Sequence, residues 1–264
     1  MNLALSNFAF DKEDEDKLFP FLIENGISGV EVVLNKIRNW GELNQDYVKD
    51  YKNKLDDCGL KCVGLQSIFY GSSIKDLNDT RGVIDHLHYV IEYASILGAE
   101  VLVLGSPTLR KNFNIFNMGV ILWEIKHQLK DTNIKLLLEP NAKYYNGEYW
   151  FSVQEILQFF HQIKIRNNVG TMIDTHNIKL EGEDPNNVIT DYIDWIDHIH
   201  VSEVHLQSLD FLHNHNVFAG TLNKMNYSKN ITYEVTKNSN NLLDSIKVFS
   251  EIYSIAFRKD IVLQ

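Results

Sequence analysis

The sequence predicts an α/β fold in which eight parallel strands close into a (β/α)8 TIM barrel, built by residues 1–264 as one domain. Two observations carry this prediction. Short apolar runs alternate with longer amphipathic stretches from one end of the chain to the other. In addition, four runs in the second half each end at or beside a polar residue of a metal-binding type. A barrel gathers such strand ends at one rim.

The expected strands are short, and several of them are almost entirely apolar, as in VLVLG at 101–105. Such composition is typical of parallel strands that are covered on both faces. The eight runs span residues 3–8, 29–33, 61–67, 100–105, 134–139, 170–174, 198–203 and 230–235. Their number and even spacing favour a closed barrel. The alternative is an open doubly wound sheet, which requires a reversal of strand order.

The segments between these runs repeat apolar residues at intervals of three and four, which predicts helices. The clearest patterns cover residues 14–25, 45–58, 80–97, 116–130 and 153–163, with a final helix at 241–257. Gly26, Gly59 and Gly98 each follow a helical pattern, where glycine ends a helix readily. Residues 206–229 show no clear helical period. The chain contains no linker-like segment, and therefore one domain is expected.

Composition and the absence of certain motifs argue against several classes of function. The net charge is -10, whereas proteins that bind the phosphate backbone of nucleic acids carry a basic face. We therefore expect no nucleic-acid partner. The first residues lack the pattern of a secretory signal, and no run has the length of a membrane span, so a cytoplasmic protein without membrane contact is expected. No glycine-rich phosphate loop is present, which argues against a nucleotide cofactor.

Glu139, Asp174, His200 and Glu234 lie at the ends of four successive runs, separated by 35, 26 and 34 residues. Each interval accommodates one strand, one helix and two loops, so a repeated βα unit would bring the four side chains to one rim. Three carboxylates and one imidazole form a ligand set for a single divalent metal ion. Mostly hard oxygen ligands favour manganese, with magnesium, cobalt and zinc as alternatives.

The motifs around these residues resemble those of a known family. LEPN at 138–141, MIDTHN at 172–177, HIHVSE at 198–203 and ITYEV at 231–235 are similar to the last four strands of the xylose isomerase-like TIM barrels. That family includes sugar phosphate isomerases and epimerases, ketose 3-epimerases, hydroxypyruvate isomerase, inosose dehydratase and the family 2 apurinic endonucleases. GVEVV at 29–33 is similar to the family's second strand.

The resemblance implies a metal-dependent sugar isomerase or epimerase. It makes Glu139 and Glu234 metal ligands that also form the catalytic acid/base pair, while Asp174 and His200 mainly hold the ion. The chemistry is consistent with this, because a divalent ion lowers the energy of an enediolate while a carboxylate removes the proton next to the carbonyl. Two carboxylates on opposite faces give epimerisation, and one carboxylate that returns the proton to the next carbon gives isomerisation.

Four further residues are candidate substrate-binding positions. By resemblance, Glu31 faces the substrate, and Glu203 supports the substrate or orients the neighbouring imidazole. His176 lies two residues beyond Asp174, and Trp40 follows the second strand in NWGEL, where an aromatic face could stack on a sugar ring.

The substrate stays open between a small carbohydrate and a keto-acid. Ketose epimerases carry a histidine and an arginine at the positions of Asn177 and Leu206, so the resemblance does not specify a ketose. A dehydratase of a keto-sugar or inosose and a non-catalytic sugar-binding barrel are alternatives. An apurinic endonuclease is disfavoured because Gln66 and Ser106 are poor zinc ligands, although the pair formed by His213 and His215 keeps it open. A monomer and a homodimer are both compatible with the sequence.

Overall fold

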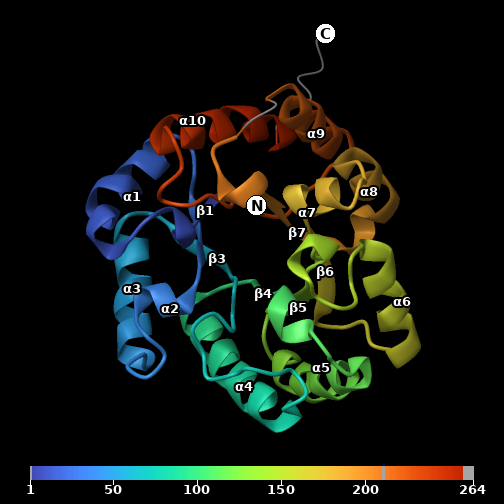
Figure 1. The fold of residues 1–264 in the computed structure, drawn as a ribbon. Coiled ribbons are helices and arrows are strands. Elements are labelled where there is room, and N and C mark those ends of the chain that lie inside the picture. Colours follow the sequence, from blue (N-terminus) through green and yellow to red (C-terminus); the bar gives the residue numbers. More distant parts are fainter. Residues whose placement is uncertain (1, 210–211, 258–264) are drawn as a thin grey trace.

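The computed structural model describes residues 2–209 and 212–257, and within them eight parallel strands close into a barrel in sequence order (Figure 1). The strands are β1 (Leu3–Ser6), β2 (Gly29–Val32), β3 (Lys61–Leu65), β4 (Val101–Leu104), β5 (Lys135–Leu138), β6 (Val169–Asp174), β7 (Ile196–Val201) and β8 (Ile231–Tyr233). The predicted (β/α)8 barrel is therefore confirmed.

Closure depends on β1, which pairs in parallel with β2 on one side and with β8 on the other. An open doubly wound sheet has two unpaired edges, so that alternative is wrong. Two register shifts interrupt the otherwise regular pairing, one between Val30 and Glu31 and one between Thr171 and Ile173. The first shift lies at Glu31 and the second lies just before Asp174, and the side chains of both residues are polar and buried.

Helices surround the barrel, and the longer ones cover the outer face of the strands (Figure 1). They are α1 (Glu15–Glu24), α2 (Leu34–Ile37), α3 (Gln45–Asp57), α4 (Thr80–Leu97), α5 (Ile115–Leu129), α6 (Val153–Ile163), α7 (Thr175–Leu180), α8 (Pro185–Tyr192), α9 (Leu212–Lys224) and α10 (Leu242–Tyr253). Local chemistry sets their ends. Asn44 caps α3 by accepting hydrogen bonds from two backbone amides, and Gly98 ends α4 with a φ of 73°. None of the described helices has the length and apolar character of a membrane span.

The helix α9 lies in the segment 206–229, where the sequence shows no clear helical period. Its residues include several asparagines and Gly220, which are weak helix formers. Phe218, Ala219 and Leu222 are nonetheless buried, and the Phe218 ring packs edge-on against Tyr253 of α10 with 6.4 Å between ring centroids. Burial against α10 thus stabilises a helix that its own propensity does not predict.

The interior of the barrel has an apolar half and a polar half. Val101, Val103, Leu137 and Met172 form a small cluster separate from the large core between strands and helices. On the side of β2, β7 and β8 the fully buried side chains are instead polar, namely those of Glu31, His198 and Thr232. Because side chains alternate along a strand, these three residues share a face with every second residue of their strands. His198 and Thr232 lie two positions before the residues that their strands present at the rim, and Glu31 lies within β2.

Gly29, the first residue of β2, lies in close contact with the two neighbouring strands. A Cβ atom at this position would be 2.6 Å from Val63 Cγ1 and 2.8 Å from Ala4 Cβ, both on neighbouring strands. Neither atom can move away alone, because Ala4 Cβ is fixed to the backbone of β1 and the Val63 side chain is β-branched and buried. The glycine is therefore required by space and not by an unusual backbone angle.

We expect Gly29→Ala to lower the free energy of unfolding by about 1–3 kcal/mol, the usual range for overpacking. Gly220→Ala is the matched control, because nothing lies within 4 Å of its added Cβ and alanine favours a helix. That control should raise the free energy of unfolding by about 0.5–1 kcal/mol. Urea unfolding followed by circular dichroism measures both. An unchanged midpoint for Gly29→Ala would show that the barrel interior is not tightly packed there.

Candidate functional site

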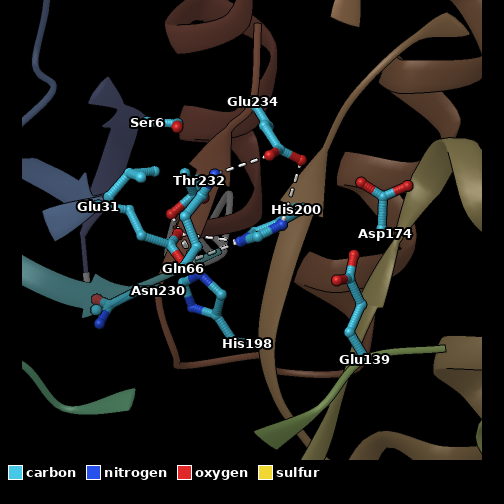
Figure 2. A network of polar contacts seen from close by, with 12 residues as sticks. Ser6, Glu31, Gln66, Glu139, Asp174, His198, His200, Asn230, Thr232 and Glu234 are labelled. Atoms are coloured by element: carbon cyan, nitrogen blue, oxygen red, sulfur yellow. Dashed lines mark hydrogen bonds and ion pairs between the residues drawn. The ribbon is translucent and has the colours of Figure 1, made fainter. Parts of the chain in front are cut away.

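Four predicted ligands lie at the carboxyl-terminal rim of the barrel. Glu139 directly follows β5, Asp174 ends β6, His200 lies near the end of β7, and Glu234 directly follows β8. Ligand atoms of Glu139, Asp174 and His200 all lie within 4.8 Å of one another. Figure 2 shows the two carboxylates of β5 and β6 beside His200, while Glu234 approaches His200 from β8. The structure therefore brings the four strand-end side chains to the same rim.

Glu234 contacts the imidazole and a neighbouring amide. Its Oε2 atom lies 3.5 Å from His200 Nδ1, and its Oε1 atom accepts a hydrogen bond of 2.7 Å from Gln66 Nε2 (Figure 2). Gln66 follows β3 and is buried, so a residue from a distant strand fixes the orientation of the Glu234 carboxylate.

Below the rim, His200 is anchored to a fully buried carboxylate. Its Nε2 atom lies 3.0 and 3.1 Å from the two oxygens of Glu31, and His198 Nε2 lies 2.8 Å from Glu31 Oε2. Burial by itself raises the pKa of Glu31, but the charges of the two imidazoles outweigh it and hold that pKa well below its usual range. Burial likewise opposes the charged form of His200, yet the Glu31 and Glu234 carboxylates raise its pKa well above the ordinary value.

The anchoring leaves one nitrogen of His200 directed at the rim. With Nε2 engaged by Glu31, the Nδ1 atom is buried and has no hydrogen-bond partner among the described residues. Glu234 is near it at 3.5 Å, and the cluster with Glu139 and Asp174 is adjacent. A carboxylate behind an imidazole is the usual support of a metal-binding histidine. The orphaned nitrogen and the donor set thus fit a divalent cation.

The carboxylates of the rim are crowded. Burial, together with the charges of Asp174 and Glu234, raises the pKa of Glu139 to about 8 against the opposing effect of His200. Burial and the charge of Glu234 also raise the pKa of Asp174, although Ser202 Oγ donates a hydrogen bond of 2.6 Å to Asp174 Oδ2. Like charges held this close favour protonation or a bound cation.

Two of the four predicted substrate-binding residues are engaged elsewhere. Both oxygens of Glu31 contact imidazoles in the barrel interior, and its side chain is fully buried. Glu203 Oε1 lies 2.6 Å from His215 Nε2 and 3.6 Å from Lys179 Nζ. Contact of Glu31 or Glu203 with the substrate remains a prediction. The contacts of both carboxylates with imidazoles do not favour it.

The other two lie around the rim. His176 is in the first turn of α7, and burial lowers its pKa while the Asp174 and Glu203 carboxylates oppose that shift. Trp40 donates from Nε1 to the Tyr70 carbonyl at 2.8 Å and packs edge-on against His86, with 4.6 Å between centroids. The Trp40 ring therefore belongs to an aromatic group beside β3, and a stacking role toward a sugar stays a prediction.

Three residues that shape the site are not among the predicted site residues. His198 could have been found, because H-x-H in a strand places both side chains on the same face. Gln66 was considered only as a poor zinc ligand, yet it holds Glu234. Asn177 stands at the position of the histidine of ketose epimerases. Its Nδ2 atom donates to Glu139 Oε1 at 3.4 Å, and its backbone N–H donates to Asp174 Oδ1 at 2.7 Å. No sequence pattern signals these amide contacts.

Solved structures with the same fold include proteins of differing activity. One is 3-keto-D-glucoside 4-epimerase YcjR of E. coli, at 14% identity and a TM-score of 0.74, with 97% of this chain and 99% of that chain covered. A family 2 AP endonuclease of Brucella melitensis shows 15% identity and a TM-score of 0.74, covering 95% and 99%. The probable 3-DHS dehydratase AsbF of Bacillus anthracis shows 16% identity and a TM-score of 0.69, covering 96% and 99%.

A search of curated protein sequences gives no match. A family model, in contrast, matches residues 19–252, which is most of the chain. Together with the closed barrel and the rim residues, this match shows that the chain belongs to the xylose isomerase-like TIM barrel family.

Proposed function

We propose that this chain is a divalent-metal-dependent isomerase or epimerase of a small carbohydrate, with Glu139 and Glu234 as the acid/base pair. The observation that carries the proposal is the convergence of Glu139, Asp174 and His200 within 4.8 Å, with Glu234 on the same imidazole. The epimerase YcjR, which shares the fold, supports this choice of reaction class.

When bound at these ligands, a divalent cation such as Mn2+ supplies polarisation of a substrate carbonyl and its neighbouring hydroxyl, which makes the proton between them more acidic. Oxygen ligands with one nitrogen suit manganese better than a structural zinc. Magnesium, cobalt and zinc are the other candidates.

The protein residues then handle the proton. Glu139 approaches from β5 and Glu234 from β8, so a substrate carbon placed between them faces a carboxylate on each side (Figure 2). One carboxylate removes the proton, and the other delivers a proton to the opposite face, which inverts the carbon. If the same carboxylate returns the proton to the adjacent carbon, the product is an isomer instead.

Three rival functions are separated by their products or their metal content. A dehydratase begins with the same proton abstraction and then loses water, so its product differs in mass. A three-zinc endonuclease needs more ligands, and the described residues contain only two candidate ligand groups, both of which include His200. A non-catalytic barrel would bind sugar without exchanging a proton.

The purified protein should hold about one divalent ion per chain, with manganese favoured. His200→Ala and Asp174→Asn should each abolish binding, because each removes a ligand of the same cluster. Mass spectrometry of metal content checks this, with His127→Ala on the outer face of α5 as the control that keeps the metal. Retention of the ion in both site variants would contradict the assignment, and three zinc ions would revive the endonuclease.

Affinity for Mn2+ should rise with pH up to about pH 8. The pKa of Glu139 is raised to about 8, so this carboxyl group holds a proton at pH 7 when no cation is bound, and the raised pKa of His200 favours the protonated imidazole as well. The cation competes with those protons, and each proton displaced changes affinity by about tenfold per pH unit. Calorimetry in buffers of different ionisation enthalpy should detect proton release at pH 7. Affinity that is constant between pH 6 and 8 would contradict this account.

Glu139→Gln and Glu234→Gln should each reduce proton exchange by about 10²- to 10⁴-fold, the usual contribution of a positioned acid or base. Ketoses, keto-acids and inosose-type substrates are screened in deuterated water, and deuterium uptake is followed by NMR. Glu251→Gln, on the exposed face of α10, is the matched control and should retain full exchange. Undiminished exchange in either site variant would remove that residue from the acid/base pair.

A further inference from the structure

Arg110 is a buried cation whose charge acts on Glu139, and it is neither a predicted site residue nor part of the proposed reaction. It ends a short 3-10 helix, Pro107–Arg110, on the rim side of β4, and only 1% of its surface is exposed. No ion pair of Arg110 is present in the described part of the chain. A guanidinium in such a place is costly to bury, so its contacts require an explanation.

The contacts of Arg110 lead toward Glu139. Its Nη2 atom donates to Asn141 Oδ1, and its Nη1 atom donates to the Tyr149 carbonyl at 3.2 Å. The guanidinium also lies over the Trp150 ring, 5.5 Å from the centroid. Burial lowers the pKa of Arg110 to about 10, and the charge of Glu139 opposes that shift, so the side chain stays charged at neutral pH.

Asn141 is the link between the two charges. Because Arg110 can only donate, it holds the Oδ1 end of the Asn141 amide and leaves the NH2 end for another acceptor. Hydrogen bonding from the Asn141 side chain lowers the pKa of Glu139 against the effect of burial, and the two side chains lie together beside Gly105. A rotation of the amide by 180° would place two donors against the guanidinium and an oxygen against the carboxylate. Arg110 therefore permits only the orientation that holds Glu139.

Gly105, which follows β4, keeps this arrangement compact. A Cβ atom at Gly105 would lie 2.0 Å from Glu139 Oε2 and 3.2 Å from Asn141 Oδ1. The carboxylate and the amide thus share the space that a side chain would occupy. From the other side, Asn177 Nδ2 donates to Glu139 Oε1 at 3.4 Å.

We infer that Arg110 is a positioning residue, which orients Asn141 and through it holds the Glu139 carboxylate at the place where it binds metal and exchanges a proton. The inference rests on the proposed function in one respect, because the proposed function makes Glu139 both a metal ligand and an acid/base residue. Arg110 also fixes the backbone at Tyr149 and Trp150, two residues with positive φ of 61° and 58°. The loop after β5 is thereby tied to the same guanidinium.

Two explanations of Arg110 predict opposite signs for metal binding. If Arg110 acts only through its charge, Arg110→Met removes a cation near the site and Mn2+ should bind more tightly. If Arg110 positions Glu139, the same change should weaken Mn2+ binding by about 10- to 100-fold, the usual effect of losing a supporting contact. Arg110→Lys keeps the charge but cannot form both hydrogen bonds, so it should recover only part of the affinity.

The experiment is Mn2+ titration calorimetry on the full chain, with melting temperature measured for every variant. Arg166→Met is the matched control, because Arg166 lies 4.9 Å over Trp195 on an exposed surface and should not affect Mn2+ affinity. If Arg110→Met fails to fold, Asn141→Ala breaks the same link and should weaken binding by a similar factor. The double variant should be no weaker than the worse single variant, since both changes act on one path.

Unchanged or tighter Mn2+ binding in Arg110→Met and in Asn141→Ala, while the wild type binds, would overturn the inference and leave the proposed function intact. If the wild type binds no metal and exchanges no proton, the proposed function fails. The positioning role is then decided by crystal structures of the wild type and of Asn141→Ala. A Glu139 carboxylate in the same place in both would refute it, and a displaced carboxylate would support it.

Discussion

The buried carboxylate of Glu31 determines which nitrogen His200 presents to the rim. Its oxygens are 3.0 and 3.1 Å from His200 Nε2, and it also contacts His198. A charged group inside a closed barrel is stable only when it is paired, and removal of one partner of such a pair costs about 3–5 kcal/mol. The geometry of the rim thus depends on an interaction that lies in the barrel interior and never meets solvent.

Above that anchor, the rim holds carboxyl groups so close together and so deeply buried that their protonated forms are favoured. Three carboxyl groups lie around one imidazole. Burial and the charge of Glu234 raise the pKa of Glu139 and that of Asp174, and the charge of Asp174 also raises the pKa of Glu139. Such a cluster opposes folding in the absence of a counter-charge, and a cation that binds only the folded chain would offset the repulsion by mass action. Catalytic sites commonly hold strain of this kind, which the rest of the fold compensates.

Sequence was sufficient for the barrel and the rim because both follow from period and spacing. The alternation of apolar runs and helical patterns identified the strands, and the intervals between Glu139, Asp174, His200 and Glu234 placed them at one end. It was insufficient where long-range packing decides the outcome. The helix α9 forms because it is buried against α10, and Glu31 contacts imidazoles 167 and 169 residues away. No local pattern specifies such pairings.

The two halves of the barrel interior give the two proposed acid/base residues different surroundings. Two residues before Glu139 and Asp174 lie Leu137 and Met172, which are apolar, so these carboxylates have no polar partner beneath them. Their hydrogen bonds come from the rim instead, where Asn177 contacts both carboxylates and the Ser202 hydroxyl donates to Asp174. Two residues before His200 lies His198, and Glu234 itself is held by Gln66 and His200. A carboxylate over an apolar floor and one inside a polar network are suited to opposite tasks in proton transfer. The division of the barrel interior is therefore the feature of the fold on which an acid and a base could be built from the same residue type.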